Sequence, residues 1–158
     1  VISVDKRPEH AAHAVAAISR FLGGLPATLE LRDGVVEELI AEFAPDRLML
    51  DLPEPWSVIE AGAEFLAEDG VVTIYVPTVP QIARTRDALR RSGLFAPPTT
   101  FEVMHREWVA DGRSVRPSHQ MVGHTGFITV AQRTQLEPGA VQEAVEEADE
   151  PVPESDLP

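Results

Sequence analysis

The chain has 158 residues, 44% of them hydrophobic, no cysteine and a formal net charge of −13. It is long enough for one domain with a core, and too apolar to be disordered throughout. With no cysteine and no apolar run near the roughly 18 to 20 residues that span a bilayer, the sequence excludes disulfides, thiol catalysis, cysteine-bound zinc and a membrane-spanning helix. An acidic chain is also a poor general binder of nucleic acid, so contact with RNA would need local basic groups.

Strand-like and helix-like patterns alternate from the first residue to about residue 91. The expected strands are short apolar or alternating runs at residues 1–4, 28–32, 48–50 and 71–76. The expected helices carry apolar residues at helical spacing, at residues 9–22, 34–43, 57–66 and 81–91. This β-α alternation predicts a parallel sheet with helices on its faces.

From residue 100 the pattern changes. Residues 101–109 and 126–132 are predicted strands, with a turn at Asp111-Gly112 and an irregular lead-in over residues 116–123. Asp-Gly between two β runs is a hairpin signal. A mostly parallel sheet that ends in an antiparallel hairpin predicts an α/β, Rossmann-like fold of the methyltransferase type.

The two ends of the chain carry different signals. Residues 137–158 hold eight acids and four prolines without Lys or Arg, and we predict a disordered acidic tail over residues 134–158. Its simplest alternative role is that of a solubilising extension. At the other end there is no initiator Met and no signal peptide, and the chain starts in a strand-like run, which suggests a fragment. The absence of cysteine fits a cytoplasmic protein. Residues 1–133 are expected to form one domain ahead of this tail.

Three acids follow three successive predicted strands, namely Asp5, Asp33 and Asp51. In an open α/β sheet these strand ends lie along one edge, where ligands bind. Carboxylates there can accept hydrogen bonds from a ribose diol or an adenine amino group. Asp51 would be nearest the reacting centre, and Pro53 and Pro55 stiffen the chain behind it. The alternative role for each acid is that of a helix N-cap.

The glycine-rich turn that usually follows the first strand of nucleotide-binding α/β folds is missing. No Gly-x-Gly occurs in residues 1–60, and Gly23-Gly24 ends a helix rather than following a strand. If residues 1–5 are the second strand of the fold, the first strand and its loop lie upstream. The sheet is therefore expected to lack its first strand.

Four segments, at residues 3–10, 51–56, 75–81 and 116–127, together resemble the tRNA (adenine-58-N1) methyltransferase family, and the acidic, proline-rich tail resembles that of its actinobacterial members. Asp51-Leu-Pro-Glu-Pro-Trp56 resembles the family's Asp-Leu-Pro-x-Pro-Trp signature. The other three are Ser3-Val-Asp-Lys-Arg-Pro-Glu-His10, Tyr75-Val-Pro-Thr-Val-Pro-Gln81 and Arg116-Pro-Ser-His-Gln-Met-Val-Gly-His-Thr-Gly-Phe127. The resemblance covers residues 1–133 and implies that they are a partial methyltransferase catalytic domain with the class I fold. It also implies S-adenosyl-L-methionine (SAM) as cofactor, tRNA as partner and a homotetramer.

The resemblance also implies roles for single residues. Asp5 would bind the SAM ribose, with His10 lining the same site, and Asp33 would contact the adenine ring of SAM. Asp51 would be the catalytic acid beside the methyl donor, where it accepts from the exocyclic amine of the target adenine. Tyr75 would stack on the flipped target base, or it is a core aromatic.

Basic and imidazole side chains are the candidates for RNA contact. Arg116, His119 and His124 are assigned to RNA or to the rim of the site, with an internal ion pair or a structural role as the alternatives. We expect no metal, because His119 and His124 lack a third ligand of matching spacing. A second arginine group is expected to form a solvated helix face: Arg84, Arg86, Arg90 and Arg91.

Two other functions compete with methyl transfer. The chain could be a non-catalytic module that binds tRNA or assembles subunits, since the glycine-rich loop is absent. A dehydrogenase is a weaker alternative, because it needs the same loop.

Overall fold

The computed structural model describes residues 1–134, which fall into two compact units: Val1–Ala44, and a second unit that begins at Pro45. Apart from Thr134, the predicted acidic tail lies outside the described residues. Within the described part, no helix is both long enough and apolar enough to cross a membrane.

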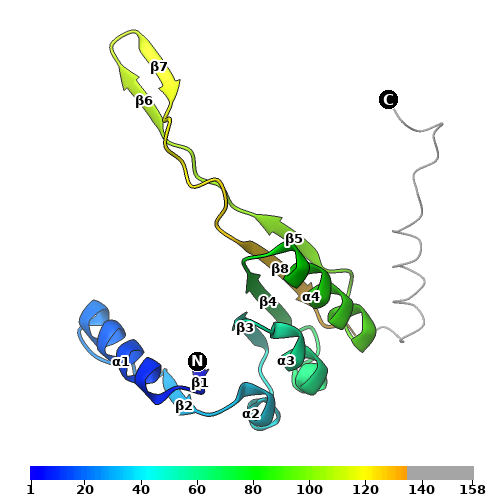
Figure 1. The fold of residues 1–158 in the computed structure, drawn as a ribbon. Helices are drawn as coiled ribbons and strands as arrows, with labels where there is room; N and C mark the ends of the chain where they lie inside the picture. Colours follow the sequence, from blue (N-terminus) through cyan, green and yellow to red (C-terminus); the bar gives the residue numbers. More distant parts are fainter. Residues whose placement is uncertain (135–158) are drawn as a thin grey trace, which may run out of the picture. The chain divides into compact units, whose positions relative to one another are not determined.

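The first unit contains β1 (Ile2–Asp5), α1 (Pro8–Leu22), β2 (Glu30–Asp33) and α2 (Val36–Phe43) (Figure 1). β1 and β2 pair in parallel as predicted. Pro8 stands in the first turn of α1, where a missing N–H costs nothing, and α1 ends at Gly23, whose φ of 78° is easy for glycine. This unit has a small core, since Ile40 is its one buried hydrophobic residue.

The second unit is built on a four-stranded sheet in the order β3-β4-β8-β5 (Figure 1). The strands are β3 (Arg47–Asp51), β4 (Val71–Val76), β5 (Thr99–Glu102) and β8 (Phe127–Gln132). β3 and β4 are parallel, whereas β8 runs antiparallel to both β4 and β5. The parallel pair and the antiparallel end of the sheet agree with the predicted fold.

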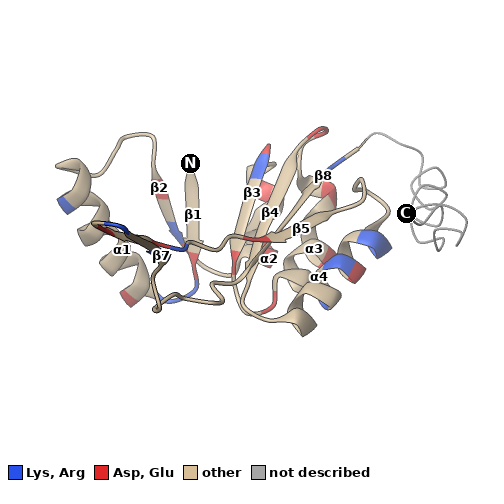
Figure 2. Ribbon diagram, turned by 90° about the horizontal axis from the view of Figure 1, so that it is seen from above, with Lys and Arg blue, Asp and Glu red and all other residues tan. Residues whose placement is uncertain are grey.

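Two helices cover one face of this sheet, α3 (Pro55–Gly62) and α4 (Val79–Ser92), with a short 3-10 turn η1 (Ala63–Phe65) after α3 (Figures 1 and 2). β4 is paired on both sides, and its alternate residues Val72, Ile74 and Val76 are fully buried. The helices contribute buried apolar side chains to the same core: Val58, Ile59, Ala88 and Leu89. This core fixes the ends of β3 and β4, where the candidate site lies.

The predicted strand at residues 101–109 is wrong in extent, because it divides into β5 and β6 (Trp108–Asp111). β5 ends at Glu102 because its partner β8 begins at Phe127, opposite Glu102, and offers no further residue to pair with. The turn at Asp111-Gly112 is confirmed, but it joins β6 to β7 (Ser114–Pro117). The end of β7 overlaps the first two residues of the segment predicted as an irregular lead-in, residues 116–123.

Candidate active site

Asp5 and Asp33 lie directly opposite each other at the ends of the parallel strands β1 and β2. The Asp5 carboxylate accepts the backbone N–H of Arg7 at 2.9 Å, and its other oxygen lies 3.7 Å from His10 Nδ1. The Arg7 backbone N–H holds the pKa of Asp5 below its usual range, with smaller contributions from the Arg7 and His10 side chains. The structure thus brings together Asp5, His10 and Asp33. Asp51, which the sequence predicted at the same sheet edge as Asp5 and Asp33, ends a strand of a separate sheet.

Asp51 and Tyr75 form the equivalent pair in the second unit, opposite each other at the ends of β3 and β4. Asp51 is exposed, and within residues 1–134 its carboxylate makes no hydrogen bond or ion pair; the same holds for Asp33. An exposed, unpartnered carboxylate at a strand end is free to accept from a ligand.

None of the three strand-end acids is a helix N-cap. The N-caps of α1, α2 and α3 are Arg7, Val35 and Glu54, and none of these side chains makes a capping bond. The capping alternative is therefore wrong for Asp5, Asp33 and Asp51.

The loop behind Asp51 is held from α4. Gln81 donates from Nε2 to the carbonyl of Pro53 at 2.9 Å, and its Oε1 accepts the Thr78 hydroxyl at 2.6 Å. Pro55 is buried at the first turn of α3. The chain after Asp51 is fixed both by proline geometry and by this side-chain bond.

The Tyr75 side chain packs against the residues that directly precede β8. Its hydroxyl donates to the carbonyl of Thr125, and its ring lies against Gly126, where a Cβ would overlap the ring and the hydroxyl. Gly126 has φ +125°, which also favours glycine. The Tyr75 side chain is 38% exposed, so it is not the core aromatic of the alternative interpretation.

Both ring nitrogens of His124 have hydrogen-bond partners. Nδ1 lies 2.6 Å from Glu102 Oε1, and Nε2 lies 2.7 Å from the carbonyl of Pro77. The bond to the Pro77 carbonyl raises the pKa of His124, and the Glu102 carboxylate raises it further. These contacts match the structural alternative that the sequence left open for this histidine.

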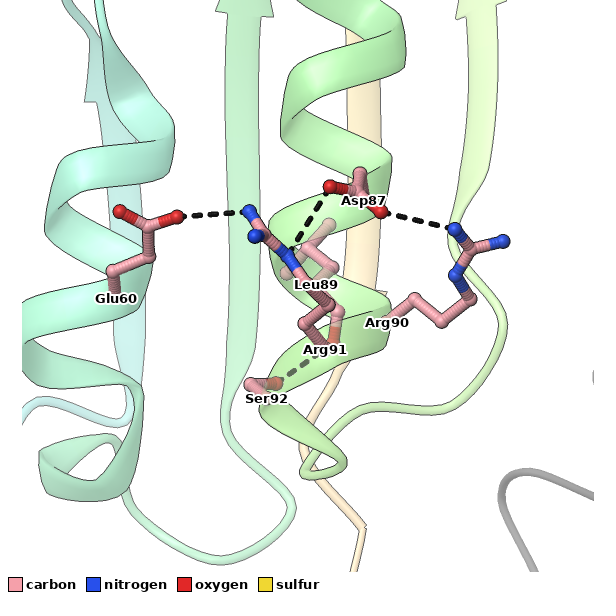
Figure 3. Close-up of polar contacts among 6 residues, drawn as sticks. All are labelled: Glu60, Asp87, Leu89, Arg90, Arg91 and Ser92. Atoms are coloured by element: carbon pink, nitrogen blue, oxygen red, sulfur yellow. Dashed lines mark hydrogen bonds and ion pairs between the residues drawn. The ribbon is translucent and has the colours of Figure 1, made fainter.

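The arginines of α4 have partners inside the protein. Arg91 bonds Glu60 at 3.0 Å and Asp87 at 3.1 Å, and Arg90 bonds Asp87 at 2.9 Å (Figure 3). Arg86 donates to the Pro98 carbonyl, and the Arg84 guanidinium lies 5.2 Å from the centroid of the Trp56 ring. These arginines therefore interact with groups of the protein itself, which agrees with the predicted role as a helix face rather than an RNA contact.

The β6–β7 hairpin and its flanks carry the basic groups without such partners. In the described part of the chain, no hydrogen bond or ion pair is made by the side chains of Arg106, Arg113, Arg116 and His119. All four are exposed. No group of three or more His, Asp or Glu side chains suited to a metal ion occurs within residues 1–134.

Glu102, Thr125 and Gly126 are site residues that the sequence analysis did not single out. Thr125 and Gly126 stand inside the segment that carried the resemblance, so the motif was a signal for them. Glu102 had no such signal, because its partner His124 is 22 residues away in the chain.

A family model described as "tRNA methyltransferase complex GCD14 subunit" matches residues 26–116. Among curated proteins, the chain is 40% identical over 100 residues to the tRNA (adenine(57)-N(1)/adenine(58)-N(1))-methyltransferase TrmI of Methanocaldococcus jannaschii, covering 63% of this chain and 35% of the relative. It is 33% identical over 134 residues to the tRNA (adenine(58)-N(1))-methyltransferase TrmI of Thermus thermophilus, covering 84% of this chain and 51% of the relative. The chain therefore spans about a third and about half of the length of these two relatives.

Two solved structures share the fold. A SAM-dependent O-methyltransferase from Thermotoga maritima superimposes with a TM-score of 0.78 at 26% identity, over 87% of this chain and 51% of the other. The tRNA (m1A58) methyltransferase TrmI from Aquifex aeolicus gives a TM-score of 0.74 at 20% identity, over 86% of this chain and 54% of the other. These similarities confirm the predicted Rossmann-like methyltransferase fold.

Proposed function

Because the chain belongs to the tRNA methyltransferase complex GCD14 subunit family, we propose that it carries the catalytic acid of a SAM-dependent tRNA adenine-N1 methyltransferase. The proposed target is the T-loop adenine named in its Thermus relative, adenine 58. The observation that carries the proposal is the pairing of Asp51, with its free carboxylate, and Tyr75 at the end of a parallel strand pair.

The chemistry needs alignment and charge stabilisation. SAM, when bound, would supply an electrophilic methyl group on a positively charged sulfur, with a neutral thioether as the leaving group. Asp51 accepts a hydrogen bond from the exocyclic amine of the adenine, which makes N1 a better nucleophile and stabilises the cation that forms on the ring. The fixed loop behind Asp51 supports this role, since a misplaced carboxylate would lose alignment.

Tyr75 contributes its ring rather than its hydroxyl. The hydroxyl already donates to the Thr125 carbonyl, which leaves the partly exposed ring face as the surface for a flipped base. We therefore assign Tyr75 to stacking.

Asp5, His10 and Asp33 are proposed to hold SAM. The unpartnered Asp33 carboxylate suits an amino group or a diol, and the lowered pKa of Asp5 keeps it ionised as an acceptor. The two carboxylates can therefore accept hydrogen bonds from the nucleoside part of SAM.

Arg116 and His119 are proposed to contact tRNA, because both are exposed and their side chains have no hydrogen-bond or ion-pair partner among residues 1–134. A guanidinium on a β-hairpin can bind a phosphate. His124, also assigned to RNA or the rim from the sequence, has both ring nitrogens occupied, which supports an internal role for it. A cytoplasmic location, where tRNA is found, is part of the same proposal.

Assembly with further copies, a homotetramer as the resemblance implies, is proposed from the β6–β7 hairpin. Trp108, Val109 and Val115 on it are 64%, 42% and 65% exposed. Exposed apolar side chains of this kind mark association surfaces. The same surface supports the second candidate function, a non-catalytic assembly module. Light scattering of the purified protein tests the tetramer; a monomer at micromolar concentration would contradict it.

The test of the activity is transfer of tritiated methyl from SAM to unmodified tRNA by the complete gene product that contains this chain. Nucleoside analysis of the product should show 1-methyladenosine. Binding of tRNA without any methyl transfer would instead favour the non-catalytic module.

A further inference from the structure

His124 occupies a position that the proposed reaction does not use. Its partner Glu102 ends β5, and its other partner Pro77 directly follows β4. In the sheet, β8 separates β4 from β5. His124 thus links the ends of two strands that do not pair with each other, on the sheet edge that carries Asp51 and Tyr75.

Both partners of the imidazole are acceptors. A backbone carbonyl has no proton to donate, and an ionised carboxylate has none either. Since a neutral imidazole has only one N–H, only the doubly protonated ring donates to Pro77 and Glu102 at once. The raised pKa of His124 agrees with this arrangement.

The residues that seat Tyr75 follow His124 directly. Thr125 accepts the Tyr75 hydroxyl through its carbonyl, and Gly126 lies under the ring. Thr125 is itself tied back to the end of β5, because its N–H donates to Glu102 at 3.4 Å and its hydroxyl donates to the Val103 carbonyl at 2.9 Å. Moving His124 would therefore move the seat of the Tyr75 ring.

We propose that His124, clamped between Glu102 and the Pro77 carbonyl, is a positioning residue that holds the Tyr75 ring in place beside Asp51. Its meaning for catalysis rests on the proposed function, in which that ring stacks on the target base. Among the described residues, Glu102 of β5 is the charged group in contact with the His124 ring. The loop after β4 contributes an uncharged carbonyl, and β8 contributes the Phe127 ring at 4.9 Å.

We call the two contacts of the His124 ring, with Glu102 and with the Pro77 carbonyl, the His124 clamp. The clamp should form at low pH and be lost at high pH. Because the contacts raise the pKa of His124 in the folded protein, the clamp is complete at low pH and is lost as the pH rises through that raised value. Above it, one of the two acceptors faces a lone pair on the ring. The Tyr75 ring should then lose its fixed position.

The sequence offers a direct probe, because Tyr75 is the only tyrosine. In an NMR titration of the 158-residue chain from about pH 5 to about pH 9, the Tyr75 ring signals should shift with the midpoint of the His124 ring protons. That midpoint should lie above about 6.5, the ordinary pKa of a histidine side chain, and it should be unchanged when His13, an exposed histidine on α1, is replaced. Tyr75 signals that stay constant while His124 titrates would overturn the proposal.

Three variants extend the test. His124→Gln should abolish the pH-dependent shift of the Tyr75 ring signals, which we call the Tyr75 transition. The control variant His13→Gln should retain it. Glu102→Gln should move the midpoint to lower pH, because the carboxylate is lost while an acceptor oxygen stays. An unmoved midpoint would count against the clamp. If circular dichroism shows that His124→Gln does not fold, the wild-type titration and the midpoint of the Glu102→Gln variant still test the proposal.

Activity provides an independent arm. In the complete gene product, kcat/KM for tRNA should fall at least about tenfold on raising the pH through the His124 midpoint, and His124→Gln should be low at every pH. A Tyr75 transition without any methyl transfer would overturn the proposed function but leave the clamp standing. Methyl transfer with a constant Tyr75 signal would overturn the clamp alone.

Discussion

The three strand-end acids differ in what surrounds them, although the sequence places them alike. Asp5 is engaged by the Arg7 N–H, whereas Asp33 and Asp51 have no partner within residues 1–134. The chain order of strands was enough to predict that Asp5 and Asp33 would lie at the same edge of a sheet. The supports of Tyr75 and the partners of His124 could not be predicted, because they come from residues 22 to 50 positions away.

Gly126 provides a test of the Tyr75 seat at the level of one residue. Gly126→Ala places a Cβ against the Tyr75 ring at φ +125°, so unfolding in urea should need about 1 to 3 kcal/mol less free energy than in the wild type. Gly123→Ala is the matched control, since nothing lies within 4 Å of its added Cβ. Equal stability of the two variants would contradict the close packing of Tyr75 on Gly126.

At the level of elements, β4 and β8, the two strands with partners on both sides, were predicted to within one residue, whereas the run at residues 101–109 was not. β4 has the predicted bounds, because its β-branched residues are buried between β3 and β8. The strand predicted at residues 101–109 ends early, at Glu102, because β8 begins opposite that residue and has no further residue to pair with β5. Whether a β-like run becomes one strand or two depends on its partner's length, which its own sequence does not contain.

The central and edge strands should respond differently to truncation of a side chain. Ile74→Ala in β4 removes a fully buried side chain and should cost about 2 to 5 kcal/mol of unfolding free energy. Met49→Ala in the neighbouring β3 removes a side chain that is 81% exposed and should stay within about 0.5 kcal/mol of the wild type. Urea unfolding followed by circular dichroism measures both, and similar costs would contradict the assigned core.

At the level of the whole molecule, the core is unevenly distributed between the two units. Among the described residues, every buried hydrophobic side chain except Ile40 belongs to the second unit. In the first unit α1 buries none of its residues, and Phe21 is 88% exposed. The alternating sequence pattern predicted the elements of both units, but it could not predict how little the first unit buries in this chain.

Amide hydrogen exchange should therefore separate the two units. Amides of β4 and β8 should be protected close to the limit set by global unfolding, while those of β1 and β2 should exchange through local opening of low free energy. Mass spectrometry of peptides from each unit makes the measurement. Equal protection of β1 and β4 would show that the first unit has a core comparable to that of the second.

The most direct test of the central claim compares two aspartates in methyl transfer to tRNA by the complete gene product. Asp51→Asn should lower kcat by about 10² to 10³, because the carboxylate that stabilises the methylated ring is lost. Asp69→Asn changes an exposed aspartate in the turn before β4, at φ 60°, which asparagine tolerates, and should leave the rate unchanged. Equal rates for Asp51→Asn and Asp69→Asn would contradict the role assigned to Asp51.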